Sequence, residues 1–315
     1  MATEPGPGPD TVIFDSAGTT CEGWFFPAGG IRSDAGPGLP VVVMAHGLGG
    51  TKDSGLAAFA TGLAAAGLHV LAFDYRGFGA SGGHPRQVVS PAGQLADYRA
   101  AMHATTRLPG TDPARLVLWG ESLSGGTVVA AADGRTDVAA VISMVPILHG
   151  PAAAWHARAN VSPASLTAST LRAGAAGLAR LAGRPPVLMP LAAPPGRVGA
   201  LTAPGYQADY LAVAGPTWCN QVDAAIAFDL ARFRPARLAR SMPCPWLVQI
   251  ADFDRAAPPN SAARTAAKGR AQVHHYPCDH FDTQPGKPWH QAALAHQIAF
   301  LRRHLELPTN SYTRI

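Results

Sequence analysis

Two hydrophobic patterns alternate along most of this chain. Short continuous apolar runs, typical of strands buried on both faces, occur at 41–45, 69–73, 115–119, 138–145, 245–251 and 271–276. Helix-like segments lie among them at 54–66, 91–106, 123–132 and 289–305. Residues 11–26 alternate apolar and polar positions, which predicts an antiparallel hairpin. Strands that alternate with helices predict an α/β fold with a mostly parallel, doubly wound sheet.

The pattern changes between residues 147 and 240. This segment is rich in alanine and interrupted by the proline pairs at 185–186 and 194–195, with amphipathic pieces between them. We interpret it as a helical cap insertion and not as a second sheet. The predicted division is a core of 11–146 and 241–307, a cap of 147–240, and flexible tails at 1–10 and 308–315.

The most informative polar motif is Gly-x-Ser-x-Ser-Gly-Gly at 120–126. It follows the strand predicted at 115–119 and leads into the helix predicted at 123–132. A sharp strand-to-helix turn of this kind holds one serine hydroxyl above the end of a sheet, and here that serine is Ser122. Small residues are needed two positions before and after it, and Gly120 and Ser124 meet that need, although a glycine is usual where Ser124 stands. By itself the motif is also compatible with a Gly/Ser loop that has no chemical role.

A glycine-rich loop, His-Gly-Leu-Gly-Gly at 46–50, follows the strand predicted at 41–45. Its glycines let backbone N–H groups come close to a substrate oxygen. The N–H groups of Leu48 and Leu123 are therefore candidate donors of an oxyanion hole. A phosphate-binding loop is the alternative, but the Lys-Ser/Thr pair of a P-loop is missing. We expect His46 to be a buried structural residue.

Two later strands are each followed by residues suited to acid–base chemistry. Asp252 and Asp254 come after the strand at 245–251, and His280 follows the last strand. An imidazole near a serine acts as a general base when a carboxylate orients it. We choose His280 as the base and Asp254 as its partner, with Asp252 as the fallback.

A metal cluster of His274, His275, Cys278 and His280 is a further alternative. Alternation along a strand sends His274 and His275 to opposite faces, one toward the core and one outward, which disfavours a shared metal ion. We expect neither a metal ion nor a cofactor.

The order Ser122, Asp254, His280, with a glycine-rich loop upstream, resembles the α/β-hydrolase superfamily. The sequence Asp-Tyr-Arg-Gly-Phe-Gly-Ala-Ser at 74–81 is similar to a structural turn found in many of these enzymes. The stretch 46–87 also resembles bacterial hydrolases grouped with dienelactone hydrolases and X-Pro dipeptidyl-peptidases. Dienelactone hydrolases use a cysteine nucleophile, whereas this chain has Ser122.

The resemblance implies a serine hydrolase with a helical cap over its site. Four aromatic residues of the cap are then expected to line an apolar acyl pocket: Trp155, Tyr206, Tyr210 and Trp218. The expected reaction is hydrolysis of a small ester or thioester through an acyl-enzyme. Acyl transfer, elimination of an acyl group such as acetate, and a non-catalytic binding role remain alternatives on the same fold.

Bulk composition narrows the partners. The chain has 315 residues, of which 47% are hydrophobic and 14% charged, as expected for a globular protein with a large core. The net charge of +5 comes without a dense Lys/Arg block, which argues against a nucleic-acid partner. The four cysteines form no C-x-x-C pair, and we see no signal peptide or membrane-spanning stretch. We therefore expect a cytoplasmic protein without a membrane partner; an oligomer is compatible with the sequence.

Overall fold

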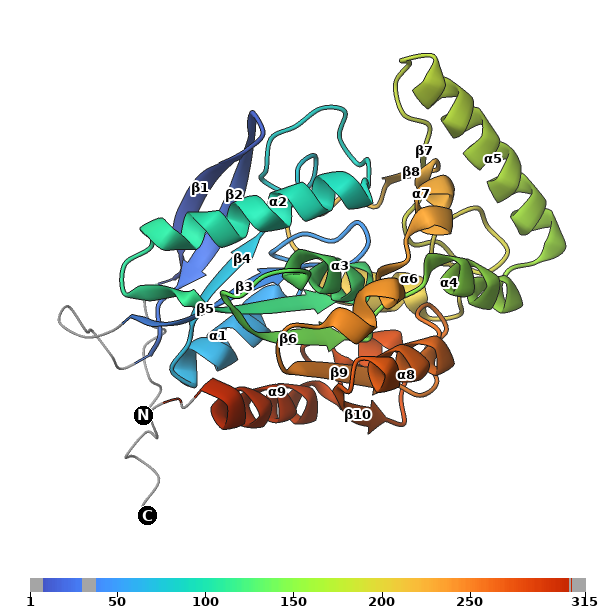
Figure 1. Ribbon diagram of the computed structural model, residues 1–315. Coiled ribbons are helices and arrows are strands. Elements are labelled where there is room, and N and C mark those ends of the chain that lie inside the picture. Colours follow the sequence, from blue (N-terminus) through green and yellow to red (C-terminus); the bar gives the residue numbers. More distant parts are fainter. Residues whose placement is uncertain (1–7, 30–37, 306, 308–315) are drawn as a thin grey trace, which may run out of the picture.

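A computed structural model of the protein describes residues 8–29, 38–305 and 307 (Figure 1). The predicted tails lie outside these residues, apart from 8–10, and Asp10 already belongs to the first strand. Among the residues described, no helix has the length and apolar character needed to cross a membrane.

In the described part of the chain, eight strands form one sheet in the order β1-β2-β4-β3-β5-β6-β9-β10. Their bounds are β1 Asp10–Ser16, β2 Thr19–Phe26, β3 Leu39–Ala45, β4 His69–Phe73, β5 Thr111–Glu121, β6 Val138–Met144, β9 Trp246–Ala251 and β10 Gln272–Tyr276. The pairs β1–β2 and β2–β4 are antiparallel, and every other neighbouring pair is parallel. The mostly parallel sheet predicted from the apolar runs is thereby confirmed.

Helices cover both faces of this sheet (Figure 1). One face carries α2 (Pro91–Ala104), α3 (Ser122–Ala132) and α8 (Pro259–Lys268); the other carries α1 (Leu56–Ala65) and α9 (His290–Leu305). Alternate residues of β3 enter the two cores: Val41 and Val43 pack on the α2/α3 side, and Val42 and Met44 on the α1/α9 side. This two-sided burial explains why the central strands appear as unbroken apolar runs.

The segment 147–240 lies between β6 and β9 in sequence and beyond the sheet in space (Figure 1). Its helices are α4 Gly150–Ala157, α5 Pro163–Leu181, α6 Tyr206–Val213 and α7 Ile226–Arg232. It also holds an antiparallel pair, β7 Leu188–Met189 with β8 Val222–Asp223. The prediction of no second sheet was therefore wrong, because two-residue strands are too short to show an alternating pattern.

Short 3₁₀ helices complete the elements: η1 Thr105–Arg107, η2 Arg158–Asn160, η3 Pro235–Ser241 and η4 His280–Thr283. Helix α8, which the sequence pattern did not predict, has Pro258 as its N-cap and Pro259 as its first residue. Proline is favoured at that first position because it has no N–H to leave unpaired.

Candidate active site

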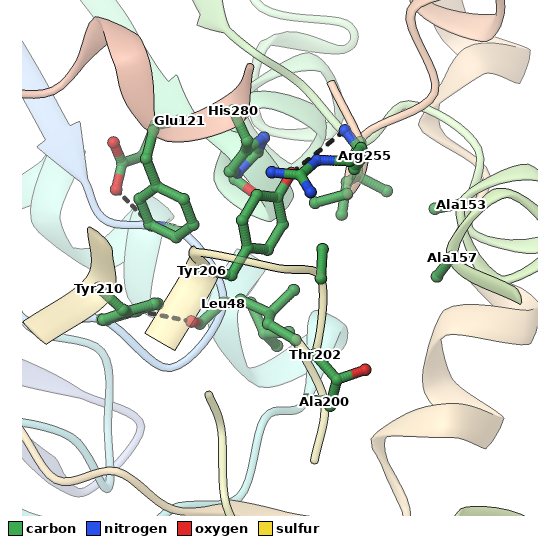
Figure 2. Close-up of a pocket in the computed structure, with 18 of the residues that line it drawn as sticks. Leu48, Glu121, Ala153, Ala157, Ala200, Thr202, Tyr206, Tyr210, Arg255 and His280 are labelled. Atoms are coloured by element: carbon green, nitrogen blue, oxygen red, sulfur yellow. Dashed lines mark hydrogen bonds between the residues drawn. The ribbon is translucent and has the colours of Figure 1, made fainter. Parts of the chain in front are cut away.

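The loops after β3, β5, β9 and β10 meet beyond the carboxyl ends of these parallel strands. They form one wall of a pocket of about 1020 Å³, and the segment 147–240 forms the other (Figure 2). Leu48, Ser122 and His280 all line this pocket. A site at this edge is where open α/β sheets usually bind ligands.

Ser122 occupies a strained turn at the start of α3. Its φ is +51°, in the left-handed region that residues with a side chain seldom adopt. Gly120 makes the turn feasible, because a Cβ at that position would stand 2.3 Å from the carbonyl oxygen of Ser124. Gly47 of the neighbouring loop also passes close to this turn, since a Cβ on it would stand 2.9 Å from the Cβ of Ser122. The local backbone therefore has the geometry predicted for a nucleophile elbow.

Asp254 and His280 form a buried pair beside this turn. His280 Nδ1–H donates to Asp254 Oδ2 over 2.7 Å. Asp254 Oδ1 accepts the backbone N–H groups of Ala256 and Ala257 at 2.8 and 2.6 Å, which fixes the carboxylate. The fallback, Asp252, instead accepts Nδ1–H of His275 at the exposed edge of the sheet.

The charge around His280 favours its protonated form. Burial opposes an imidazolium, but the charge and hydrogen bond of Asp254, together with the charges of Glu121 and Asp279, raise the pKa of His280 above its ordinary value. Asp279 adds to this effect, and its carboxylate also accepts the backbone N–H of His280 at 2.7 Å. An imidazole in these surroundings is well suited to accept a proton from a hydroxyl.

The backbone N–H groups of Leu48 and Leu123 have the freedom that oxyanion donors need. Leu123 lies in the first turn of α3, where an N–H has no acceptor within the helix. The N–H of Leu48 has no hydrogen-bond acceptor within the described residues. The loop that carries Leu48 is held by Tyr210, whose hydroxyl donates to the Leu48 carbonyl over 2.9 Å.

Three side chains of the segment 147–240 bond directly to the loops of the site. Besides Tyr210, the hydroxyl of Tyr206 donates to Asp279 Oδ1 at 2.7 Å, and His156 Nε2–H donates to the backbone carbonyl of Asp254 at 2.7 Å. Each contact ends on a loop that carries a candidate site residue. The segment thus contributes to holding these loops in place as well as lining the pocket.

Comparison with known proteins places this chain in a family. A sequence model of the family described as serine aminopeptidase S33 matches residues 37–277, more than half of the chain. The chain belongs to this family of α/β hydrolases. The superfamily and fold predicted from the motifs are confirmed.

Three relatives illustrate the likeness. The quorum-quenching protein AidA of Acinetobacter baumannii is 35% identical over 298 residues, which cover 94% of this chain and 95% of AidA. Thiohydrolase aneE of Aspergillus aculeatus is 39% identical over 109 residues, which cover 35% of this chain and 34% of aneE. The α/β hydrolase GrgF of Penicillium sp. sh18 superposes with a TM-score of 0.75 over 94% of this chain and 99% of its own, at 21% identity, which supports the fold alone.

Of the four aromatic residues predicted to line the pocket, two do so. Tyr206 and Tyr210 are buried and line it (Figure 2). Trp155 is 72% exposed on the outer side of α4, because Ala153 and Ala157, four residues apart, take the inner face. Trp218 stacks behind Tyr210, with ring centroids 5.0 Å apart, and does not line the pocket. The prediction was wrong for these two tryptophans.

Small residues that belong to no sequence motif form much of the pocket wall. Ala153 and Ala157 of α4 face Leu48, Thr202 and Tyr206 across the cavity (Figure 2). Further alanines line the pocket at 154, 200, 203 and 256. An alanine-rich stretch contains no polar residues that would mark a site. The four-residue spacing of 153 and 157 was the one sequence feature indicating that both lie on the same face of a helix.

Glu121 and Gln284 are among the polar pocket residues that the sequence analysis also missed. Glu121 lies inside the elbow motif, directly before Ser122, at a position where the motif does not specify a residue type. Gln284 lies in the loop after η4 and belongs to no recognisable pattern.

The two histidines of β10, His274 and His275, do not line the pocket. His274 is half-buried and stacks on His296, with ring centroids 3.9 Å apart, while His275 is exposed. Neither enters the core, so the prediction that one of them points inward was wrong, because β10 is the edge strand. Within the described residues, no group of three or more His, Cys, Asp or Glu side chains is arranged to hold a metal ion.

Proposed function

We propose that this protein is a serine hydrolase that cleaves an ester or thioester through an acyl-enzyme on Ser122. The observation that carries the proposal is that His280, which is hydrogen-bonded to the buried Asp254, lines the same pocket as a serine in a strained elbow. Membership in an α/β-hydrolase family, and relatives named for quorum quenching and for thiohydrolase activity, support a hydrolytic reaction.

In the proposed first step, His280 Nε2 takes the hydroxyl proton of Ser122 as the serine oxygen attacks the substrate carbonyl. Because Nδ1–H is bound to Asp254, Nε2 is the ring nitrogen that remains for this exchange. Asp254 stabilises the imidazolium that forms. His280 then donates the proton to the departing alcohol or thiol, which leaves the acyl group on Ser122.

The second step reverses these roles. His280 removes a proton from water, the hydroxide attacks the acyl carbonyl, and the proton returns to Ser122 as the free acid departs. In both steps the N–H groups of Leu48 and Leu123 would hold the negative oxygen of the tetrahedral intermediate. Removing one such donor costs about 3 kcal/mol in comparable sites.

The shape of the pocket favours an apolar acyl group. Ala153 and Ala157 form an uncharged wall opposite Leu48, and Leu230 also lines the pocket. The one cationic side chain among the pocket residues, Arg255, is engaged by Asp279, with its Nε–H donating over 2.6 Å. We therefore propose that the acyl chain lies along the inner face of α4.

Turnover of p-nitrophenyl esters tests this function. We expect the wild type to release both p-nitrophenol and the free acid, and Ser122→Ala to lose about 10³-fold or more of that activity with an unchanged circular dichroism spectrum. Chromatography of the products separates hydrolysis from acyl transfer, which would give a new ester in place of the acid. Equal turnover by Ser122→Ala would refute the proposed nucleophile.

A further inference from the structure

One buried acid at the pocket has no part in the mechanism above. Glu121, the last residue of β5, lines the pocket directly before Ser122. Its Oε1 accepts the backbone N–H of Gly47 at 3.2 Å, and its Oε2 accepts Nε2–H of Gln284 at 2.6 Å. Within the described residues, no lysine or arginine forms an ion pair with it.

These contacts match an ionised carboxylate. Burial raises the pKa of Glu121 above its ordinary value, although the bonds from Gln284 and Gly47 and the positive charge of His280 act to lower it. Each carboxylate oxygen accepts one N–H group, the role that an ionised carboxylate fills with both of its oxygens. Two donors and no counter-ion are an unusual arrangement for a carboxylate kept for stability alone, because such groups are usually paired with a cation when buried.

The bond to Gly47 ties Glu121 to the oxyanion loop. Gly47 immediately precedes Leu48, the proposed donor, and passes so close to Ser122 that a Cβ there would touch the serine side chain at 2.9 Å. The loop is thus held from both sides, by Glu121 at the Gly47 N–H and by Tyr210 at the Leu48 carbonyl. Placement of oxyanion donors is sensitive to displacements of a fraction of an ångström.

Glu121 also belongs to the set of charges around His280. The groups that act on this imidazole are Asp254 from the loop after β9, Asp279 from the loop after β10, and Glu121 from β5. The rings of Tyr206 and Phe281 pack near it, with centroids 6.4 and 5.4 Å away, and Arg255 lies beyond, bound to Asp279. Of the three carboxylates, only Glu121 comes from the strand that leads directly into Ser122.

From this arrangement we infer that Glu121 is a positioning residue, which anchors the oxyanion loop through Gly47 and places an additional negative charge near His280. The inference rests on the proposed function, because it concerns the same serine and imidazole. Glu121 then has two tasks, a hydrogen bond to Gly47 and a negative charge near His280. Different substitutions remove these two tasks.

Gln284 makes the two tasks separable. Its Oε1 is buried and has no hydrogen-bond partner within the described residues. In Glu121→Gln, the new amide oxygen can still accept from Gly47, and its NH₂ can donate to Gln284 Oε1 once that amide turns over. Glu121→Gln therefore removes the charge and keeps the anchor, whereas Glu121→Ala removes both. Asp137→Asn is the matched control, since Asp137 pairs with Arg135 at the opposite end of the sheet.

The test measures the rate at which a fluorophosphonate labels Ser122 across pH, because labelling needs the serine, the imidazole and the oxyanion hole but no particular substrate. In Glu121→Gln we expect the acid limb of the rate profile to move to lower pH, with a plateau within about threefold of wild type. In Glu121→Ala we expect the same movement and a plateau lower by about tenfold or more. Asp137→Asn should match wild type in both respects.

Each of the following results would refute one part of the proposal. An unmoved acid limb in Glu121→Gln would refute the role of the charge, and equal plateaus in the two Glu121 variants would refute the anchor. If Glu121→Ala does not fold, as judged by circular dichroism, the Gln284→Leu variant replaces it, because it removes the other hydrogen bond that holds the Glu121 carboxylate; its plateau should then fall below that of Glu121→Gln. Wild-type protein that is not labelled at Ser122 would instead refute the proposed function itself.

Discussion

The hydroxyl of Ser124 donates a hydrogen bond to the backbone carbonyl of His46 over 2.5 Å, and it also bonds the hydroxyl of Tyr75 at 2.8 Å. The residue that replaces the usual glycine therefore joins the turn that carries Ser122 to the start of the loop that carries Leu48, 78 positions away in sequence. The substitution adds a contact that a glycine cannot make.

We expect Ser124→Ala to weaken this connection. The carbonyl of His46 and the hydroxyl of Tyr75 would remain buried with one partner fewer, which costs about 1–3 kcal/mol in the free energy of unfolding. Urea denaturation measures that loss, and ester turnover should fall with it because the loop is less well held. Tyr75→Phe is the comparison, since it removes one bond and leaves the one to His46. Equal stability of wild type and Ser124→Ala would contradict a connecting role.

The raised pKa of His280 predicts the pH dependence of the reaction. The imidazole must be neutral to accept the serine proton, so kcat/KM should rise with pH through an apparent pKa above the ordinary value of 6.5. Asp254→Asn removes the charge that raises this pKa and supports the wrong tautomer, so kcat should fall by about 10³–10⁴-fold. A pH series with one p-nitrophenyl ester measures both. An acid limb below pH 6.5 would contradict a raised pKa for His280, and an Asp254→Asn variant as active as wild type would contradict the role of the pair.

The inner face of α4 predicts a change in acyl-chain preference. Ala157→Phe places a ring in the pocket opposite Leu48, so kcat/KM for p-nitrophenyl octanoate should fall about tenfold or more while the acetate value changes little. Trp155→Ala, on the outer face of the same helix, is the matched control and should leave both values unchanged. An equal fall for acetate and octanoate in Ala157→Phe would show that the chain does not lie along α4.

A buried ion pair between Lys52 and Asp74 fixes the chain just after the glycine-rich loop 46–50. Lys52 Nζ lies 2.7 Å from Asp74 Oδ2, both side chains are buried, and Asp74 Oδ1 accepts the backbone N–H of Lys52. Asp74→Ala leaves a buried ammonium with only Glu22, which is 2.9 Å away and partly exposed. The expected loss is about 3–5 kcal/mol in the free energy of unfolding, measured by urea denaturation. A loss below about 1 kcal/mol, as for an exposed pair, would contradict this role.

The sequence predicted the sheet well because its central strands are buried on both faces. The run 41–45 corresponds to β3 (Leu39–Ala45), and the run 69–73 coincides with β4. Residues after these strands were predictable for the same reason, since parallel strands bring their carboxyl ends together. The preference for Asp254 over Asp252 agrees with the contact to His280.

The parts that were missed depend on tertiary packing. Trp155 was expected in the pocket because the family resemblance implied a cap with aromatic residues over the site, but the orientation of α4 decides which of its residues face inward. The significance of Glu121 comes from Gly47 and Gln284, which lie 74 and 163 positions away and leave no local signal. Likewise, the strands β7 and β8 are separated in sequence by residues 190–221 and are too short to produce a pattern.

The central claim is that Ser122 is the nucleophile, and covalent labelling tests it most directly. The protein is incubated with a fluorophosphonate and digested, and the modified residue is located by mass spectrometry. We expect one adduct, on Ser122, that is absent from Ser122→Ala and strongly reduced in a folded His280→Ala variant. An adduct on any other residue, or equal labelling of Ser122→Ala, would contradict the account.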